Sequence, residues 1–490
     1  MVTIQSLNQA AKTPPLVALL MDAGKTLAPV KPYEDLPGVL AQFPEFKGEM
    51  EDQLLWRSSP KKGVASRVLI LGIGDAAELD AEKCRCVAAA AVKRAISLDL
   101  DHIAIFMPAV KTLPLNAKAV VGALTEGAVL GNHRFSRYQE DKKKPLKKII
   151  LWASAQTAKR LKGYVRQVEK ICQGTLLARE WVSVPANDKR PEVLAIEMVQ
   201  QAKVAGLGAF CRGKTWLKRS KMGGILAVNQ GSSQEPRLVV LHHKPKQSRK
   251  KIVLVGKGVT FDTGGYNLKP TGSIETMKVD MGGGAAVAAT LITAAKTKLS
   301  HEVIGIIPLV ENMVSGTAVR PGDIITMGNG KRVEINNTDA EGRLILADAL
   351  AWGIKTYQPD MVIDLATLTG ACLVALGSDI AGLFTHDEAM GQALVAAAKA
   401  TFERVWPLPL PDEYKKLLKS PVADLSNIGK NRWGGAITAA LFLSAFVETP
   451  KWAHIDIAGP AYTAKDTAYC KSGGTGFGVR LLMHFMESVA

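Results

Sequence analysis

The stretch KIVLVGKGVTFDTGG, residues 251–265, joins an apolar strand to charged residues placed where that strand ends. Residues 251–261 form a short, mostly apolar and β-branched run, which is typical of a strand buried in the core of a sheet. Lys257 breaks this run and Asp262 follows it directly. Because open α/β sheets bind ligands beyond the carboxyl ends of their strands, this stretch predicts both a buried strand and one edge of a functional site.

Strand-like and helix-like segments alternate on the C-terminal side of this stretch. Strands are predicted over 303–310, 360–368 and 452–459, and the helices expected between them cover 283–298, 344–357 and 435–448. Alternation of this kind favours an α/β fold with a mainly parallel sheet.

The N-terminal part of the chain shows the same alternation. Strands are predicted over 67–74, 102–108 and 147–154, with a helix over 81–97. A length of 490 residues favours two domains. We expect two α/β domains, the second with a mixed sheet flanked by helices: an N-terminal domain over 1–161, a linking helix and boundary over 162–188, and a catalytic domain over 189–490.

The composition is that of a water-soluble globular protein, with 47% hydrophobic and 22% charged residues. No apolar run is long enough for a membrane span. Asp22 and Lys25 interrupt the apolar stretch near the N-terminus, so we expect no secretory signal. The six cysteines are scattered, without a disulfide framework or metal-binding spacing, which indicates a reducing cytoplasm.

The formal net charge is +17, and basic residues cluster over 141–148 and 244–251. One interpretation is two solvated, lysine-rich surface loops. The alternative is an electrostatic surface for nucleic acid. Neither cluster has interleaved aromatic residues or a known DNA-reading motif, so the signal for nucleic acid is weak.

Four carboxylates lie near predicted strand ends and helix starts: Asp262, Asp280, Asp339 and Glu341. Together in one pocket they would repel one another and be driven towards protonation. Two divalent cations would neutralise them and would activate water for hydrolysis. Zinc, manganese and magnesium all suit such ligands. The histidines are dispersed, which argues against histidine ligation.

Simpler explanations exist for each segment taken alone. Asp339 or Glu341 could cap a helix, DTGG could be a plain turn, and VDMGGG a glycine-rich helix start. These explanations leave Lys257, Lys269 and Arg343 without a role, which favours a shared site.

Five segments resemble the leucyl aminopeptidase family of two-metal peptidases: NTDAEGRL (337–344), VGKGVTFDTGG (255–265), KVDMGGGAA (278–286), DLATLTGAC (364–372) and GGAITAALFL (434–443). The resemblance implies an aminopeptidase that binds two divalent cations, Mn²⁺ or Zn²⁺. By position, it implies five metal ligands: Lys257, Asp262, Asp280, Asp339 and Glu341. A lysine ligand must be neutral, so we expect a depressed pKa for Lys257 beside the cations.

The resemblance also implies catalytic and substrate-binding roles. Lys269 matches a lysine that stabilises the oxyanion, and Arg343 an arginine that holds a bicarbonate acting as general base. Pocket positions for the N-terminal side chain of the substrate match Met277, Thr367, Leu368 and Gly370. The expected substrates are peptides with leucine or other apolar N-terminal residues, and the expected assembly is a homohexamer.

Two rival functions remain at this point. One is a DNA-binding or regulatory protein on the same scaffold, either instead of catalysis or as a second function. The other is an amidase or esterase that uses the same metals but needs no free amino group in its substrate.

Overall fold

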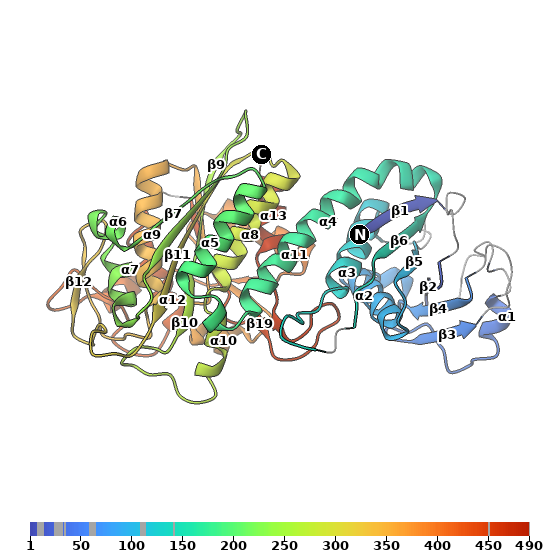
Figure 1. The fold of residues 1–490 in the computed structure, drawn as a ribbon, viewed down its shortest axis with the longest axis horizontal. Coiled ribbons are helices and arrows are strands. Elements are labelled where there is room, and N and C mark those ends of the chain that lie inside the picture. Colours follow the sequence, from blue (N-terminus) through green and yellow to red (C-terminus); the bar gives the residue numbers. More distant parts are fainter. Residues whose placement is uncertain are drawn as a thin grey trace. The chain divides into compact units, whose positions relative to one another are not determined.

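The computed structural model describes residues 1–6, 14–23, 33, 36–57, 65–107, 114–140, 143–448 and 451–489. These residues form two compact units. Residues 1–173 and 465–472 make up unit 1, and residues 174–464 and 473–490 make up unit 2 (Figure 1).

Unit 1 is an α/β unit whose described strands form a six-stranded sheet in the order β1-β6-β5-β2-β4-β3. All neighbours are parallel except β3 and β4. Helices α2 and α3 pack against each other and on this sheet. The elements are β1 Val2–Ser6, β2 Val17–Met21, α1 Leu36–Leu40, β3 Gln53–Arg57, β4 Arg67–Gly72, α2 Ala81–Ser97, β5 His102–Phe106, α3 Ala117–Gly131 and β6 Lys148–Ala153.

The predicted elements of unit 1 are confirmed, with differences at their ends. Helix α2 has the predicted bounds because Asp80 caps it, accepting a hydrogen bond from the Lys83 amide at 2.7 Å. Strand β5 ends at Phe106, and Pro108, part of the predicted strand, lies outside the described residues.

Helix α4, Ala155–Ser183, contributes residues to both units. The predicted start of this helix at residue 162 is wrong, because Ser154 begins the helix seven residues earlier by accepting a hydrogen bond from the Thr157 amide at 3.2 Å. The first turns of α4 are mostly polar, so the spacing of apolar residues in the sequence does not reveal where this helix begins.

A short segment from the C-terminal part of the chain, Lys465–Ser472, belongs to unit 1. The Tyr469 hydroxyl lies 3.2 Å from Oε2 of Glu82, and Nζ of Lys93 donates to the carbonyl of Thr467 at 2.8 Å. Helix α2 therefore holds this segment in place.

Unit 2 is built on a larger mixed sheet, nine-stranded among the described residues, in the order β16-β15-β18-β14-β9-β11-β8-β7 with β10 beside β11. Its central strands β18, β14, β9 and β11 are parallel. The strands are β7 Gly208–Arg212, β8 Arg237–His243, β9 Lys251–Gly256, β10 Gly258–Asp262, β11 Glu302–Asn312, β14 Met361–Ala366, β15 Ala381–Thr385, β16 Val405–Pro407 and β18 Trp452–Asp456.

Helices cover both faces of this sheet, as the resemblance and the alternation predict. In Figure 1, α5 and α8 lie on one side of β9 and β11, and α9 lies on the other. The helices are α5 Pro191–Val204, α6 Lys214–Arg219, α7 Gly223–Val228, α8 Gly282–Thr297, α9 Gly342–Tyr357, α10 Gly370–Leu376, α11 Glu388–Thr401, α12 Gly435–Ser444 and α13 Val479–Ser488. Short strands complete the unit: β12 Ile324–Thr326, β13 Arg332–Glu334, β17 Leu425–Ser426, β19 Tyr462–Thr463 and β20 Gly473–Gly474.

The start of α8 lies very close to the sheet. A Cβ on Gly283 would lie 2.0 Å from the carbonyl oxygen of Leu365, at the end of β14. Only glycine allows this approach, which brings the start of α8 beside the carboxyl ends of β9 and β14.

Among the described helices, none combines the length and apolar composition needed to cross a bilayer.

Candidate metal centre

Five buried polar residues lie at the carboxyl ends of parallel strands in unit 2. Lys257 follows β9, Asp262 ends β10, Asn312 ends β11, Thr367 follows β14 and Asp456 ends β18. All five are buried. Parallel neighbours end at one edge of the sheet, so the predicted convergence at this edge is confirmed.

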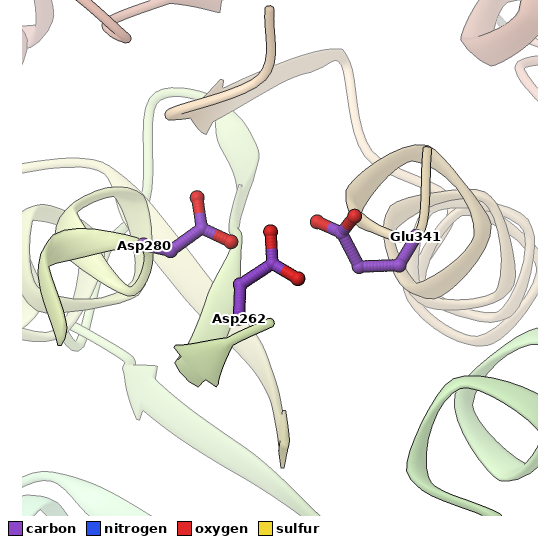
Figure 2. Close-up of side chains that lie close together, drawn as sticks. All are labelled: Asp262, Asp280 and Glu341. Atoms are coloured by element: carbon purple, nitrogen blue, oxygen red, sulfur yellow. The ribbon is translucent and has the colours of Figure 1, made fainter. Parts of the chain in front are cut away.

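Three carboxylates from separate segments form the centre of this edge. Asp262, Asp280 and Glu341 point into the same space (Figure 2), and each offers an oxygen within 4.8 Å of the others. They come from the end of β10, the turn before α8 and the start of α9. A short distance between three buried acids demands a positive counter-charge.

Lys257 supplies part of that charge. Its Nζ lies 2.8 Å from Oδ1 of Asp280 and 2.8 Å from Oε1 of Glu341. It also donates to the carbonyl of Thr367 at 2.9 Å. Burial lowers the pKa of Lys257, but the two carboxylates outweigh burial and the net direction is upward. Cations bound beside it would act in the opposite direction, because they repel an ammonium group.

Lys269 forms a second cationic contact, nearer to the solvent. Its Nζ lies 2.9 Å from Oδ2 of Asp262 and 2.5 Å from Oδ1 of Asp339. The loop after β10 is held by Asp262 itself, whose Oδ1 accepts from the Gly264 amide at 2.9 Å. Asp339 is more exposed than the three central acids, with a side chain about one-third exposed (32%).

The four acids differ in whether burial or the nearby lysines have the larger effect on the pKa. Burial raises the pKa of Asp262 to about 6, with Glu341 adding to the rise. Burial also raises the pKa of Asp280 and of Asp339. At Glu341 burial acts in the same sense, but Lys257 and Lys269 prevail and the pKa falls. The pKa is therefore raised at Asp262, Asp280 and Asp339, where burial is the largest cause, and lowered at Glu341, where the lysines outweigh burial.

Two buried carboxylate oxygens lack any hydrogen-bond donor among the described residues: Oδ2 of Asp280 and Oε2 of Glu341. A buried oxygen of this kind is costly unless a cation or a donor reaches it. The donor set, made of carboxylates and one amine, suits hard or borderline divalent cations. The residues present therefore fit a metal centre.

Arg343 lies on the first turn of α9, next to this centre. Its Nη1 donates to the carbonyl of Asn427 at 2.8 Å, whereas its buried Nε has no partner among the described residues. Burial lowers its pKa to about 10, against the opposing effect of Glu341. A buried guanidinium with a free donor suits a small anion.

All of the candidate site residues line one cavity of about 430 Å³. The structure brings together the eleven positions predicted from the sequence: Lys257, Asp262, Lys269, Met277, Asp280, Asp339, Glu341, Arg343, Thr367, Leu368 and Gly370. The lining combines charged groups with apolar surface from Met277 and Leu368. The cavity can hold a small organic group beside the acids.

The sequence reasoning missed three buried residues that support this cavity: Asn312, Asn427 and Asp456. Nδ2 of Asn312 donates to Oδ1 of Asp262 at 2.8 Å and to the carbonyl of Thr338 at 3.0 Å. A signal for two of them was present, because Asn312 follows a predicted strand and Asp456 interrupts an apolar one.

Comparison with known proteins gives this geometry a family. Residues 176–483 match the cytosol aminopeptidase family, catalytic domain, and residues 39–142 match the N-terminal domain of the same family. A probable cytosol aminopeptidase of Chlorobaculum tepidum is 41% identical over 488 residues, covering 95% of this chain and 94% of the relative. One from Chlorobium phaeobacteroides is 41% identical over 475 residues, covering 92% and 94%.

A solved structure gives the same result. The bottromycin maturation enzyme BotP in complex with Mn is 34% identical, with a TM-score of 0.88, covering 97% of this chain and 99% of that protein. Two domain matches, full-length relatives and this fold agree, and the chain belongs to the cytosol aminopeptidase family.

Proposed function

We propose that this protein is a metal-dependent aminopeptidase that releases N-terminal residues, with leucine and other apolar side chains preferred. The observation that carries the proposal is a group of three buried acids inside a cavity of a cytosol aminopeptidase fold, with two oxygens that have no donor in the described part of the chain. The names of the relatives and the Mn complex of BotP support the same reaction class.

The proposed metal ligands are the five residues around these oxygens: Lys257, Asp262, Asp280, Asp339 and Glu341. Asp262 and Glu341 occupy the bridging positions in this proposal. Two divalent cations, Mn²⁺ or Zn²⁺, would supply Lewis acidity, which polarises a carbonyl and lowers the pKa of water. Asn312 keeps Asp262 in place, since it donates to the oxygen that does not face Lys269.

Lys269 and Arg343 have the proposed catalytic roles. The Lys269 ammonium lies at the more open side of the acids, where it can donate to an oxyanion that develops on the substrate. Nε of Arg343, which has no hydrogen-bond partner in the part of the chain that the structure describes, would hold a bicarbonate. The bicarbonate would supply a general base, because the carboxylates are committed to the cations.

Substrate preference follows from the apolar part of the cavity. Met277, Thr367, Leu368 and Gly370 would line the pocket for the N-terminal side chain, and their largely uncharged surface favours leucine-like groups. The amidase and esterase rival needs no free amine, so leucine amide and its N-acetylated form separate the two functions.

The decisive experiment is hydrolysis of a leucine anilide after chelation and after Mn²⁺ or Zn²⁺ is added back. Glu341→Ala should remain inactive with metal, while Glu388→Ala, at an exposed position of α11, should behave like the wild type. A metal-loaded wild type that is inactive on a panel of N-terminal residues would overturn the proposal.

A homohexamer is proposed from the family resemblance, and a cytoplasmic location from the scattered cysteines. The domain bounds expected from the sequence, 1–161 and 189–490 joined by 162–188, differ from the two units, because residues 162–173 and 465–472 belong to unit 1. The basic segments support no second function. Residues 143, 144, 147 and 148 are exposed, Asp141 and Lys142 lie outside the described residues, and the segment 244–251 is exposed or half-buried. This is the pattern of solvated loops, so we do not propose DNA binding.

A further inference from the structure

Asp456 uses both of its carboxylate oxygens inside the core of unit 2. It is the last residue of β18 and has no exposed surface. Oδ1 accepts from the amide of Leu368 at 3.0 Å and from that of Ala458 at 3.1 Å. Oδ2 accepts from the hydroxyl of Thr369 at 2.7 Å. Asp456 therefore binds the segment that leaves the neighbouring strand β14.

This segment, residues 367–370, follows the last paired residue of β14, and two of its residues, Thr367 and Thr369, are buried. Ala366 is the last residue of β14 that pairs with β18, opposite Asp456. The amides beyond it need other acceptors, because an unpaired buried N–H is costly. A carboxylate at the end of β18 meets this need and holds the amide of Leu368 in one place.

Thr369 connects Asp456 to helix α10. The Thr369 hydroxyl that donates to Asp456 also accepts from the amide of Cys372 at 3.0 Å, as the N-cap of the helix. A hydroxyl can donate one hydrogen bond and accept another, so Thr369 links Asp456 to the first turn of α10.

The other end of the segment touches the candidate metal centre. The Thr367 carbonyl accepts from Nζ of Lys257 at 2.9 Å, and the Thr367 hydroxyl donates to Oδ1 of Asp280 at 2.7 Å. A shift of this segment would therefore change the orientation of Lys257 and Asp280, and all four of its residues also line the cavity.

We propose that Asp456 is a positioning residue, which fixes residues 367–370 and through Thr367 sets the orientation of Lys257 and Asp280. Asp456 has no hydrogen bond to Lys257 or Asp280 in the described structure, and it reaches the cavity lining through Leu368, Thr369 and Ala458. This role rests on the proposed function, since it matters for catalysis only if Lys257 and Asp280 hold metal.

Asp364 provides a matched comparison. Asp364 is equally buried and lies on β14. Its two oxygens form hydrogen bonds with Nε1 of Trp452 at 2.7 Å and with Nδ1 of His454 at 2.6 Å. None of its hydrogen bonds in the described structure reaches residues 367–370. Asp364→Asn therefore measures the general cost of losing a buried charge beside β18.

The test compares Asp456→Asn with Asp364→Asn in full-length protein, by hydrogen exchange, Mn²⁺ affinity and peptide kinetics. In Asp456→Asn, the amide nitrogen replaces the oxygen that accepts from Thr369. We expect faster amide exchange over 368–372 and a 10–100-fold loss in Mn²⁺ affinity and in kcat/KM. Asp364→Asn should keep wild-type exchange in this segment and wild-type affinity.

Two further variants cover the possibility that Asp456→Asn does not fold. Thr369→Val removes the hydroxyl and should reproduce the loss of protection and of Mn²⁺ affinity, whereas Thr369→Ser should retain wild-type values. Equal losses in Asp364→Asn and Asp456→Asn, or unchanged exchange and Mn²⁺ affinity in Asp456→Asn and Thr369→Val, would overturn the positioning role. A wild type that binds Mn²⁺ but cleaves no peptide would overturn the proposed function alone, because exchange and affinity still test Asp456.

Discussion

Nζ of Lys257 lies 2.8 Å from Oε1 of Glu341, and both side chains are buried at the edge where the central strands end. In the proposed enzyme this lysine has two roles. It is a ligand when cations are bound, and it is the counter-ion of the acids after chelation.

Lys257→Met is therefore expected to destabilise the chelated protein. The variant leaves Asp280 and Glu341 without their shared cation, and removal of one partner of a buried ion pair costs about 3–5 kcal/mol. Urea unfolding in the presence of a chelator measures this change. Lys214→Met, at an exposed site, is the control, and a similar free energy of unfolding in the two variants would contradict the ion-pair role.

Gly283→Ala should disturb the contact between α8 and the sheet. The new Cβ would lie 2.0 Å from the backbone oxygen of Leu365, which cannot move without breaking β14 from its neighbours. We expect a loss of about 3 kcal/mol or more in unfolding free energy. Thermal unfolding tests this against Gly316→Ala, where the added Cβ meets no atom within 4 Å. Equal melting temperatures would show that the helix can shift freely.

Asn427→Ala should lower peptidase activity, although Asn427 is not one of the proposed metal ligands. The Asn427 side chain accepts from the Asn336 amide at 2.9 Å and donates to the Asn337 carbonyl at 2.6 Å, which fixes the loop before Asp339. We expect kcat/KM to fall 10–100-fold, as for residues that orient ligands. Asn336→Ala removes only a side-chain contact to Ser426 and should stay near wild type. Similar kinetics in both variants would argue against the loop-fixing role.

Lys189 predicts a specific dependence of stability on pH. Its buried Nζ donates to the carbonyls of Trp181 and Val182, at 2.9 and 2.8 Å, and burial lowers its pKa well below the ordinary value of 10.5. Between the lowered folded pKa and 10.5 the unfolded state binds more protons, so stability rises with pH.

The slope from this one group reaches about 1.4 kcal/mol per pH unit within that window. Lys189→Gln keeps an uncharged donor but does not titrate, so its unfolding free energy should rise less between pH 8 and 10. Denaturant unfolding across this range gives the difference directly, and parallel curves for the two proteins would rule out a neutral Lys189.

Elements and site residues could be predicted from the sequence where they stand out from the local pattern of apolar residues or lie at the end of a predicted strand. Lys257 and Asp262 stand out because they interrupt or follow a buried apolar run, and the segment 337–344 stands at the start of a helix. The helix over 81–97 was predicted to the residue because its cap, Asp80, is also local.

Supporting residues could not be predicted in this way, because their roles depend on which distant strands become neighbours. Asn427 follows the short strand β17. Its partner Asn337 lies 90 positions earlier in the sequence. Asp456 acts on residues 368 and 369 only because β14 and β18 pair in one register. No local pattern encodes that pairing.

The segment Lys465–Ser472 has a consequence for biosynthesis. Unit 1 combines residues 1–173 with residues 465–472, which are synthesised after residues 174–464. The contacts of Tyr469 with Glu82 and of Thr467 with Lys93 cannot form until residues 467 and 469 have been synthesised. The sheet of unit 1 is therefore synthesised before the segment that packs on its helix α2.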